Sequence, residues 1–281
     1  MRASVLLLAV LCLSLLPYPG RADVATVSLD PISSPSGMYW KDLSGTPYDA
    51  AFQSSFSYAD ANVTLAYETF DPAHFTGTLT ATGLKPNFAY QMKLNGKPTN
   101  VWGAEGDDAT NERIGYTARW WRSTPTAGNS NDADYNAHHS DPAYTYTGYL
   151  LYDFFVTDAT GSATVPFSSD DVYHVLWKTS QRAPHANDGP IRVYDINGTL
   201  VDLYGEWEPT RALPGTLVLP PGAYDVQFYL TEESFHDPSA GWASVMEKDY
   251  VGFNIAPEPG TLALCVVGAM GLLGLRRRRK T

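Results

Sequence analysis

The chain has 281 residues, and its 19 Lys and Arg against 30 Asp and Glu give a formal net charge of −11. Hydrophobic residues make up 44% of the sequence and charged residues 17%, a composition that supports a folded core and excludes a disordered chain. Phosphate binding needs a basic face, so we expect no nucleic-acid partner for this acidic protein.

Residues 1–22 have the features of a secretory signal peptide. Arg2 supplies a positive charge, and an apolar run follows at residues 5–16, too short to span a bilayer comfortably. Gly20 and Ala22 place small residues before a cleavage position. We predict an N-terminal signal helix, export through the secretion machinery and cleavage after residue 22; an uncleaved N-terminal anchor is the alternative.

The body that remains, residues 23–256, contains no cysteine, because Cys12 and Cys265 both lie in the terminal segments. An exported body of this kind holds together without disulfides, and a cysteine nucleophile or a thiolate metal site is excluded. The length of the body is sufficient for stability from a hydrophobic core.

The pattern of the body predicts an all-β fold. Runs rich in Val, Tyr, Phe, Thr and Leu alternate with turn residues, and Val63, Leu65 and Tyr67 share one face of the first strand. Two Asn-Gly pairs, at residues 95–96 and 197–198, predict hairpin turns. The predicted strands cover residues 61–70, 75–82, 88–94, 149–156, 162–167, 172–178, 191–196, 199–204, 216–219, 224–231 and 250–255.

Two stretches repeat the order strand, proline-containing corner, tyrosine and alternating strand. Pro86 and Tyr90 form one copy, Pro220 and Tyr224 the other. A proline fixes such a turn, and the tyrosine hydroxyl can bond back to it. The pattern resembles the corners of immunoglobulin-like and fibronectin type III sandwiches, which implies an architecture and no activity. We predict one elaborated β-sandwich, with two sandwiches as the alternative; the body is also similar to uncharacterised secreted proteins that share residues 83–90.

A helical, loop-rich insertion at about residues 103–142 interrupts the strand pattern. We expect a short helix within residues 107–121, with Ile114, Trp120 and Trp121 on its buried side. The long polar loop that follows is typical of functional or mobile segments.

The polar loop contains a candidate calcium site formed by Asn129, Asn131, Asp132 and Asp134. Calcium prefers six to eight oxygen ligands and accepts irregular loops, although this run lacks the EF-hand pattern. Asx turns explain the same composition without a metal. Calcium is the one cofactor that the sequence suggests, and we expect none to be required.

Trp120, Trp121 and Trp207 lie in polar, loop-like sequence and are candidates for stacking on sugar rings. Aromatic faces offer apolar packing, and neighbouring carboxylates accept hydrogen bonds from sugar hydroxyls. The alternative is that these rings belong to an aromatic core.

Carboxylates for glycoside hydrolysis are available at residues 206 and 208 and at Glu232 and Glu233. Hydrolysis needs two carboxyls at a defined separation across the substrate, which a sequence does not show. We expect solvated charges at strand ends instead. The chain has no GxSxG, HExxH or GxGxxG motif, so we predict no catalysis.

The C-terminal segment, residues 257–281, combines a Pro-Glu-Pro motif, an apolar run at 261–275 that predicts a transmembrane helix, and a basic cluster that stays in the cytoplasm. It resembles the PEP-CTERM sorting signal of exported bacterial proteins. The resemblance implies recognition by an exosortase, cleavage near the motif, and transfer to the cell surface or release. A generic membrane anchor is the alternative. The residues that carry the resemblance are Pro257, Glu258, Pro259, Arg276, Arg277, Arg278 and Arg279.

These features favour a non-enzymatic exported protein of the cell surface or extracellular matrix, anchored transiently by its C-terminal helix and associated with polysaccharide. One alternative is an extracellular hydrolase acting on polysaccharide, with Glu206 or Glu233 as its first candidate carboxylate. The other alternative is a purely structural surface protein.

Overall fold

The computed structural model describes residues 23–32, 39–96, 108–170, 173–176, 191–203, 206–209, 216–233 and 243–256. The predicted signal peptide, the Pro-Glu-Pro motif and the predicted transmembrane helix lie outside the described residues. Within those residues, no helix is long and apolar enough to cross a membrane.

Strands dominate the described chain, as the sequence pattern predicts. The helical elements are few and short: α2 (Ala50–Ser55), the 3-10 helix η1 (Tyr58–Asp60), α3 (Asp108–Thr117) and α4 (Asp132–His138). The strands are β1 (Val24–Ser28), β2 (Asp30–Pro31), β3 (Asn62–Glu68), β4 (Phe70–Asp71), β5 (Thr76–Thr82), β6 (Ala89–Asn95), β7 (Arg119–Thr124), β8 (Gly128–Ser130), β9 (Thr145–Val156), β10 (Ala163–Ser168), β11 (Tyr173–Leu176), β12 (Ile191–Tyr194), β13 (Leu200–Leu203), β14 (Glu206–Pro209), β15 (Gly222–Glu232) and β16 (Ser244–Ile255).

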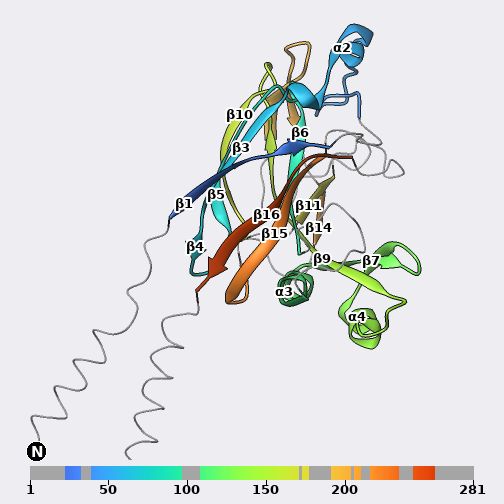
Figure 1. Cartoon of the computed structure of the whole chain (residues 1–281). Helices are drawn as coiled ribbons and strands as arrows, with labels where there is room; N and C mark the ends of the chain where they lie inside the picture. The colour runs from blue at the N-terminus through green and yellow to red at the C-terminus, as the bar shows by residue number, and fades with distance from the viewer. Residues whose placement is uncertain are drawn as a thin grey trace, which may run out of the picture.

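The strands form two main sheets that face each other (Figure 1). The smaller sheet has the order β1-β3-β5-β10. The larger has the order β2-β16-β15-β6-β9-β7-β8, with β4 pairing in parallel to β16. Two further antiparallel pairs, β11 with β14 and β12 with β13, complete the described strands.

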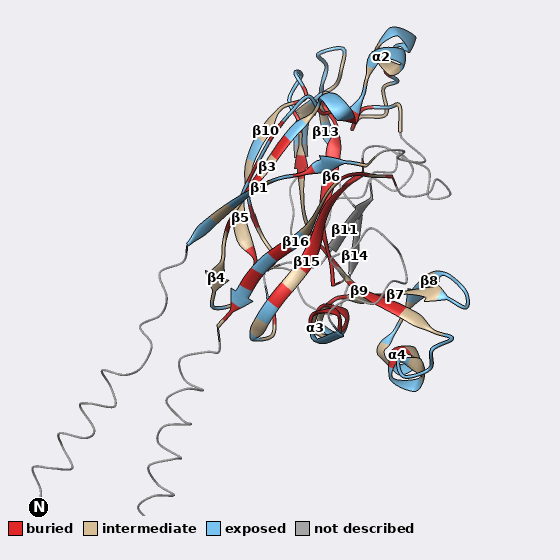
Figure 2. Ribbon diagram, in the orientation of Figure 1, coloured by how far each residue is buried: buried red, intermediate tan, exposed pale blue. Residues whose placement is uncertain are grey.

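A hydrophobic core fills the space between the two sheets. Val63, Leu65 and Tyr67 point inward from β3, which confirms the predicted alternation. They share one cluster of buried residues with strands β6, β9, β15 and β16 of the larger sheet, where buried residues concentrate (Figure 2). Phe75 packs against rings from both layers, with its centroid 5.2 Å from that of Phe167 and 4.6 Å from that of Phe253.

Both proline corners are closed by the tyrosine that follows them, as the sequence predicts. The Tyr90 hydroxyl lies 3.0 Å from the backbone N–H of Lys85 and accepts its hydrogen bond. The Tyr224 hydroxyl donates to the carbonyl of Pro220 at 2.7 Å. Each bond fixes the start of a central strand, β6 or β15, against the turn before it.

Three turns share one sequence and one hydrogen-bond pattern, Asp-x-(Ser/Thr/Asn)-Gly-(Ser/Thr). In each, the aspartate Oδ1 accepts the backbone N–H groups two and four residues later, at 2.7–3.0 Å. The glycine adopts a positive φ of 94°, 76° or 80°. The turn at residues 195–199 confirms the hairpin turn predicted at residues 197–198, and the turns at 42–46 and 158–162 are further copies.

The hairpin predicted at Asn95-Gly96 is wrong, because β6 pairs with β9 and β15 and not with the next strand along the chain. The Gly96 N–H donates to the carbonyl of Gly148 at 2.7 Å. A Cβ at Gly96 would lie 2.6 Å from the Cα of Asn111. The glycine therefore allows α3 to approach the end of β6. Residues 216–219, also predicted as a strand, form none.

Candidate functional site

Glu232 ends β15 and Glu233 follows it, and both are buried, with relative exposures of 1% and 0%. The expectation that they are solvated charges is therefore wrong. β15 lies between β6 and β16, and Glu232 is in register with Tyr90 of β6. Neighbouring residues of a strand point to opposite faces, so each carboxylate meets a different set of partners.

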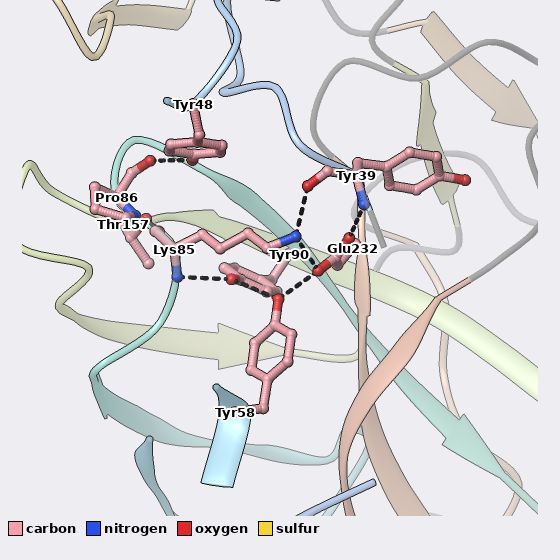
Figure 3. A network of polar contacts seen from close by, with 8 residues as sticks. All are labelled: Tyr39, Tyr48, Tyr58, Lys85, Pro86, Tyr90, Thr157 and Glu232. Carbon is pink, nitrogen blue, oxygen red and sulfur yellow. Dashed lines mark hydrogen bonds and ion pairs between the residues drawn. The ribbon is translucent and has the colours of Figure 1, made fainter. Parts of the chain in front are cut away.

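Glu232 points toward the core and forms an ion pair with Lys85 (Figure 3). The Lys85 Nζ lies 2.6 Å from Oε1 of Glu232 and donates a second bond, of 2.5 Å, to the carbonyl of Tyr39. Oε1 also accepts from the Tyr58 hydroxyl at 2.5 Å, and Oε2 accepts the N–H of Tyr39 at 2.6 Å. Both side chains of the ion pair are 0% exposed.

Aromatic rings surround the Lys85 ammonium group. The ring centroids of Trp40 and Phe88 lie 4.2 and 4.9 Å from Nζ, and those of Phe56 and Tyr58 lie 5.8 and 5.9 Å away. Ring faces attract a cation, and this attraction is stronger where water is excluded. The site is therefore a desolvated Lys–Glu pair within an aromatic box.

Burial has the largest effect on the pKa values of the ionisable groups in this network. It lowers the pKa of Lys85 and raises the pKa of Glu232, and in each case the attraction between the two groups opposes the effect. Burial also raises the pKa values of Tyr58 and Tyr90 well above that of a free phenol, with the Glu232 charge adding to the effect. The two phenols keep their protons, so the Tyr58 hydroxyl remains a donor to the carboxylate.

Glu233 points to the other face of the larger sheet and pairs with Lys93 of β6. Its Oε1 lies 3.2 Å from the Lys93 Nζ and accepts from the Thr231 hydroxyl at 2.6 Å. β6 is buried on both faces, so its outward side chains, Gln91, Lys93 and Asn95, form a buried polar row. This row can hold hydrogen-bonding groups in place but presents little accessible surface.

Trp120 lies on a strand and not on the predicted helix, so the helix is wrong for this residue, whereas its predicted burial and the aromatic-core alternative are confirmed. α3 ends at Thr117, and Trp120 belongs to β7, where it is 0% exposed. Its ring stacks on Tyr135 at 3.7 Å, and its Nε1 donates to Asp132 at 2.9 Å. A fully buried ring offers no face to a sugar.

Trp121, the next residue of β7, points to the opposite face and is partly exposed. Trp207 lies on β14, in register with Val175 of β11, and its side chain is outside the described part of the structure. Burial therefore excludes Trp120 as a sugar contact, and Trp121 and Trp207 remain candidates.

The four candidate calcium ligands lie in one unit formed by β8 and α4. The Asn129 Oδ1 accepts from the Tyr149 hydroxyl, and Asn131 caps α4 by accepting the N–H of Asp134 at 3.0 Å. Asp132 accepts from the Trp120 indole. These side-chain hydrogen bonds therefore hold much of the predicted polar loop in a defined conformation.

Asp134 accepts hydrogen bonds from Ser130 and from the Tyr146 hydroxyl and pairs with Arg122 at 3.0 Å. The hydrogen bonds from Ser130 and Tyr146 and the charge of Arg122 lower the pKa of Asp134. The Asx interpretation accounts for these contacts, and calcium binding stays a prediction. Within the described residues, no three His, Cys, Asp or Glu side chains are placed to hold a metal ion.

The sequence contains one signal for the buried pair. The alternation Val226, Phe228, Leu230 places residue 232 on the same core-facing side of β15, so Glu232 extends an inward-facing row. Lys85 has no such signal, because it lies in a corner and its partner is 147 positions away.

Comparison of this sequence with models of protein families and with curated proteins finds no match.

Proposed function

We propose that this protein is a non-enzymatic exported protein of the cell surface or extracellular matrix, sorted by an exosortase-like enzyme. The observation that carries the proposal is the order of parts in residues 257–281: Pro-Glu-Pro, apolar run, basic cluster. The N-terminal signal sequence and the absence of cysteine from the body agree with export of a protein that needs no oxidative folding.

The partners of the most prominent carboxylates support a role without catalysis. A glycosidase needs two carboxyls that flank the bond to be cleaved. Glu232 and Glu233 are instead paired with Lys85 and Lys93 inside the fold, and at 1% and 0% exposure they do not reach a substrate. This observation speaks against Glu233 as the carboxylate of the hydrolase alternative, whereas the Glu206 side chain lies outside the described residues.

We further propose that the two-layered body is an elaborated immunoglobulin-like or fibronectin-type sandwich. The two corner tyrosines, Tyr90 and Tyr224, support this likeness, since each closes a proline corner before a central strand. The fold carries no activity with it.

For association with polysaccharide, Trp121 and Trp207 remain the candidate contacts. The test is sedimentation of the purified protein with polysaccharide from the producing cells, alongside an assay for new reducing ends. We expect co-sedimentation without cleavage, and an association about two- to tenfold weaker for Trp121→Ala, because stacking on an aromatic ring contributes about 0.5–1.5 kcal/mol. Tyr250→Ala, at an exposed site on β16, is the control and should bind normally.

The other results of this experiment identify the alternatives. New reducing ends would establish the hydrolase. Neither sedimentation nor cleavage would leave the purely structural surface protein.

A further inference from the structure

The body of this protein contains a lysine and a carboxylate that are in contact, buried and far apart in sequence. Lys85 precedes β6 and Glu232 ends β15, and 147 positions separate them. The Nζ–Oε1 distance is 2.6 Å, and both side chains are 0% exposed. Because Oε1 is bonded to the carboxyl carbon, the amine is also within a short approach of Cδ. Reacting groups held at such separations behave as if at very high concentration.

The surroundings favour the uncharged forms of both groups. Trp40, Phe56 and Phe88 exclude water from the pair. Burial lowers the pKa of Lys85 and raises the pKa of Glu232, and both directions favour transfer of a proton from the ammonium to the carboxylate. The resulting neutral amine is a nucleophile, and the resulting neutral acid is an acceptor for it.

The two carboxyl oxygens have different donors, which suits them to different roles (Figure 3). The backbone N–H of Tyr39 lies 2.6 Å from Oε2, where it can stabilise negative charge developing on that oxygen. The Tyr58 hydroxyl lies 2.5 Å from Oε1 and 3.0 Å from the Tyr90 hydroxyl. A phenol in this position can pass a proton to a departing oxygen.

We propose that Lys85 and Glu232 become joined by an isopeptide bond. The Nζ lone pair attacks Cδ, the C–O π electrons move to Oε2, and the N–Cδ bond forms. The nitrogen passes a proton to Oε1, 2.6 Å away, and the Tyr58 hydroxyl assists the departure of this oxygen by donating a hydrogen bond to it. The Cδ–Oε1 bond then breaks, water leaves, and the carbonyl re-forms at Oε2. Amine and acid give amide and water, with no oxidant, metal or co-substrate.

Such a bond supplies the cysteine-free body with a covalent link between strands that are far apart in sequence. It ties the corner before β6 to the end of β15, two adjacent strands at the centre of the larger sheet. This inference is independent of the proposed sorting and polysaccharide binding, since it concerns the body alone.

The direct test is mass spectrometry of the purified full chain. We expect the intact mass to be lower than the sequence mass of the same processed form by one water molecule. After proteolysis, we expect a branched peptide that joins the segments around Lys85 and Glu232. An unreduced mass, with the two residues recovered on separate linear peptides, would overturn the proposal.

Three variants sharpen this test. Lys85→Arg keeps the positive charge but removes the nucleophilic amine, so we expect no branched peptide. Lys93→Arg alters the neighbouring pair and should leave the branched peptide in place. Tyr58→Phe removes the phenol, and we expect linkage after synthesis to slow on the order of 10²-fold. A branched peptide in Lys85→Arg would show that another residue is linked and would contradict the assignment.

Discussion

Lys85 illustrates how this protein accommodates a buried charge. Removing a lysine from water is costly unless the charge is paired and its hydrogen bonds are satisfied. Here the ammonium group contacts the Glu232 carboxylate, the Tyr39 carbonyl and the face of Trp40. The carboxylate in turn accepts two further bonds, from Tyr58 and Tyr39. Removal of Lys85 or Glu232 leaves the other as a buried group without an opposite charge beside it.

We therefore expect Lys85→Met to lower the free energy of unfolding by at least about 3–5 kcal/mol, because it leaves the Glu232 carboxyl buried without its cation and also prevents the proposed link between the two residues. The matched control is Lys248→Met, which breaks the exposed pair between Lys248 and Asp30 and should cost less than about 1 kcal/mol. Urea denaturation measures both. Equal losses in the two variants would show that the buried pair contributes no more than a surface one.

Among individual residues, the sequence predicts inward-facing apolar side chains well and buried charges poorly. Val63, Leu65 and Tyr67 follow from alternation, and the bonds of the corner tyrosines follow from local spacing. Glu232 was misplaced because charged residues are usually exposed, and its partner comes from a distant part of the chain. Only the tertiary structure brings Lys85 to it.

Among the elements, the repeated aspartate–glycine turns connect strands in different settings. The turn at residues 158–162 leads from β9 in the larger sheet to β10 in the smaller, whereas the turn at 195–199 joins the hairpin β12–β13. Gly161 and Gly198 have nearly the same φ, 76° and 80°. A Cβ at Gly161 would lie 1.9 Å from the Leu84 carbonyl oxygen, whereas no described atom lies within 4 Å of one at Gly198.

Comparison of Gly161 with Gly198 distinguishes the cost of a positive φ from the cost of a steric clash. Gly198→Ala should cost about 1–2 kcal/mol, the penalty for a left-handed residue with a Cβ. Gly161→Ala should cost clearly more, because the Leu84 carbonyl must also move, and the Leu84 N–H donates a hydrogen bond to the Gly161 carbonyl. Denaturation of both variants checks the order. A smaller loss for Gly161→Ala would contradict the close approach.

Strands with a strongly alternating apolar pattern can be predicted from the sequence, whereas strands recognised only by their pairing partners cannot. β3, β5, β6 and β15 lie close to their predicted ranges. The sequence does not predict β1, β2 and β4, because they are short and pair with partners far along the chain. It also does not predict β7 and β8, which pair with each other as a local hairpin but lie in the insertion expected to be a helix and a polar loop. The order of strands in each sheet depends on those long-range pairings and had no local signal.

In the molecule as a whole, many tyrosines contribute to the core. Burial raises the pKa of Tyr39, aided by Glu233 and Glu232, to about 12, and it raises those of Tyr58, Tyr90 and Tyr152 well above 10. The unfolded chain ionises its tyrosines near pH ~10. The folded protein therefore binds more protons than the unfolded chain above this pH.

We predict that the free energy of unfolding falls as the pH rises from about 10 to about 12, because these tyrosines must lose their protons. Their contribution is fully present below pH ~10. A Lys85 that is not joined to Glu232 acts in the opposite direction, since its pKa is lowered, but its effect ends near the ordinary lysine value of about 10.4. Urea midpoints followed with phenolate absorbance measure this. Full phenol ionisation near pH ~10 in a protein that stays folded would contradict the burial of these rings.

The central claim, that the chain is sorted through its C-terminal segment, is tested most directly by its fate in the producing cells. The measurement is fractionation with mass analysis of the C-terminus, for the natural chain and for a variant with Pro257, Glu258 and Pro259 all changed to Ala. We predict that the natural chain loses the basic cluster and reaches the surface or medium, while the variant keeps its full C-terminus and stays in the membrane. The same location and the same C-terminus for both chains would contradict the claim.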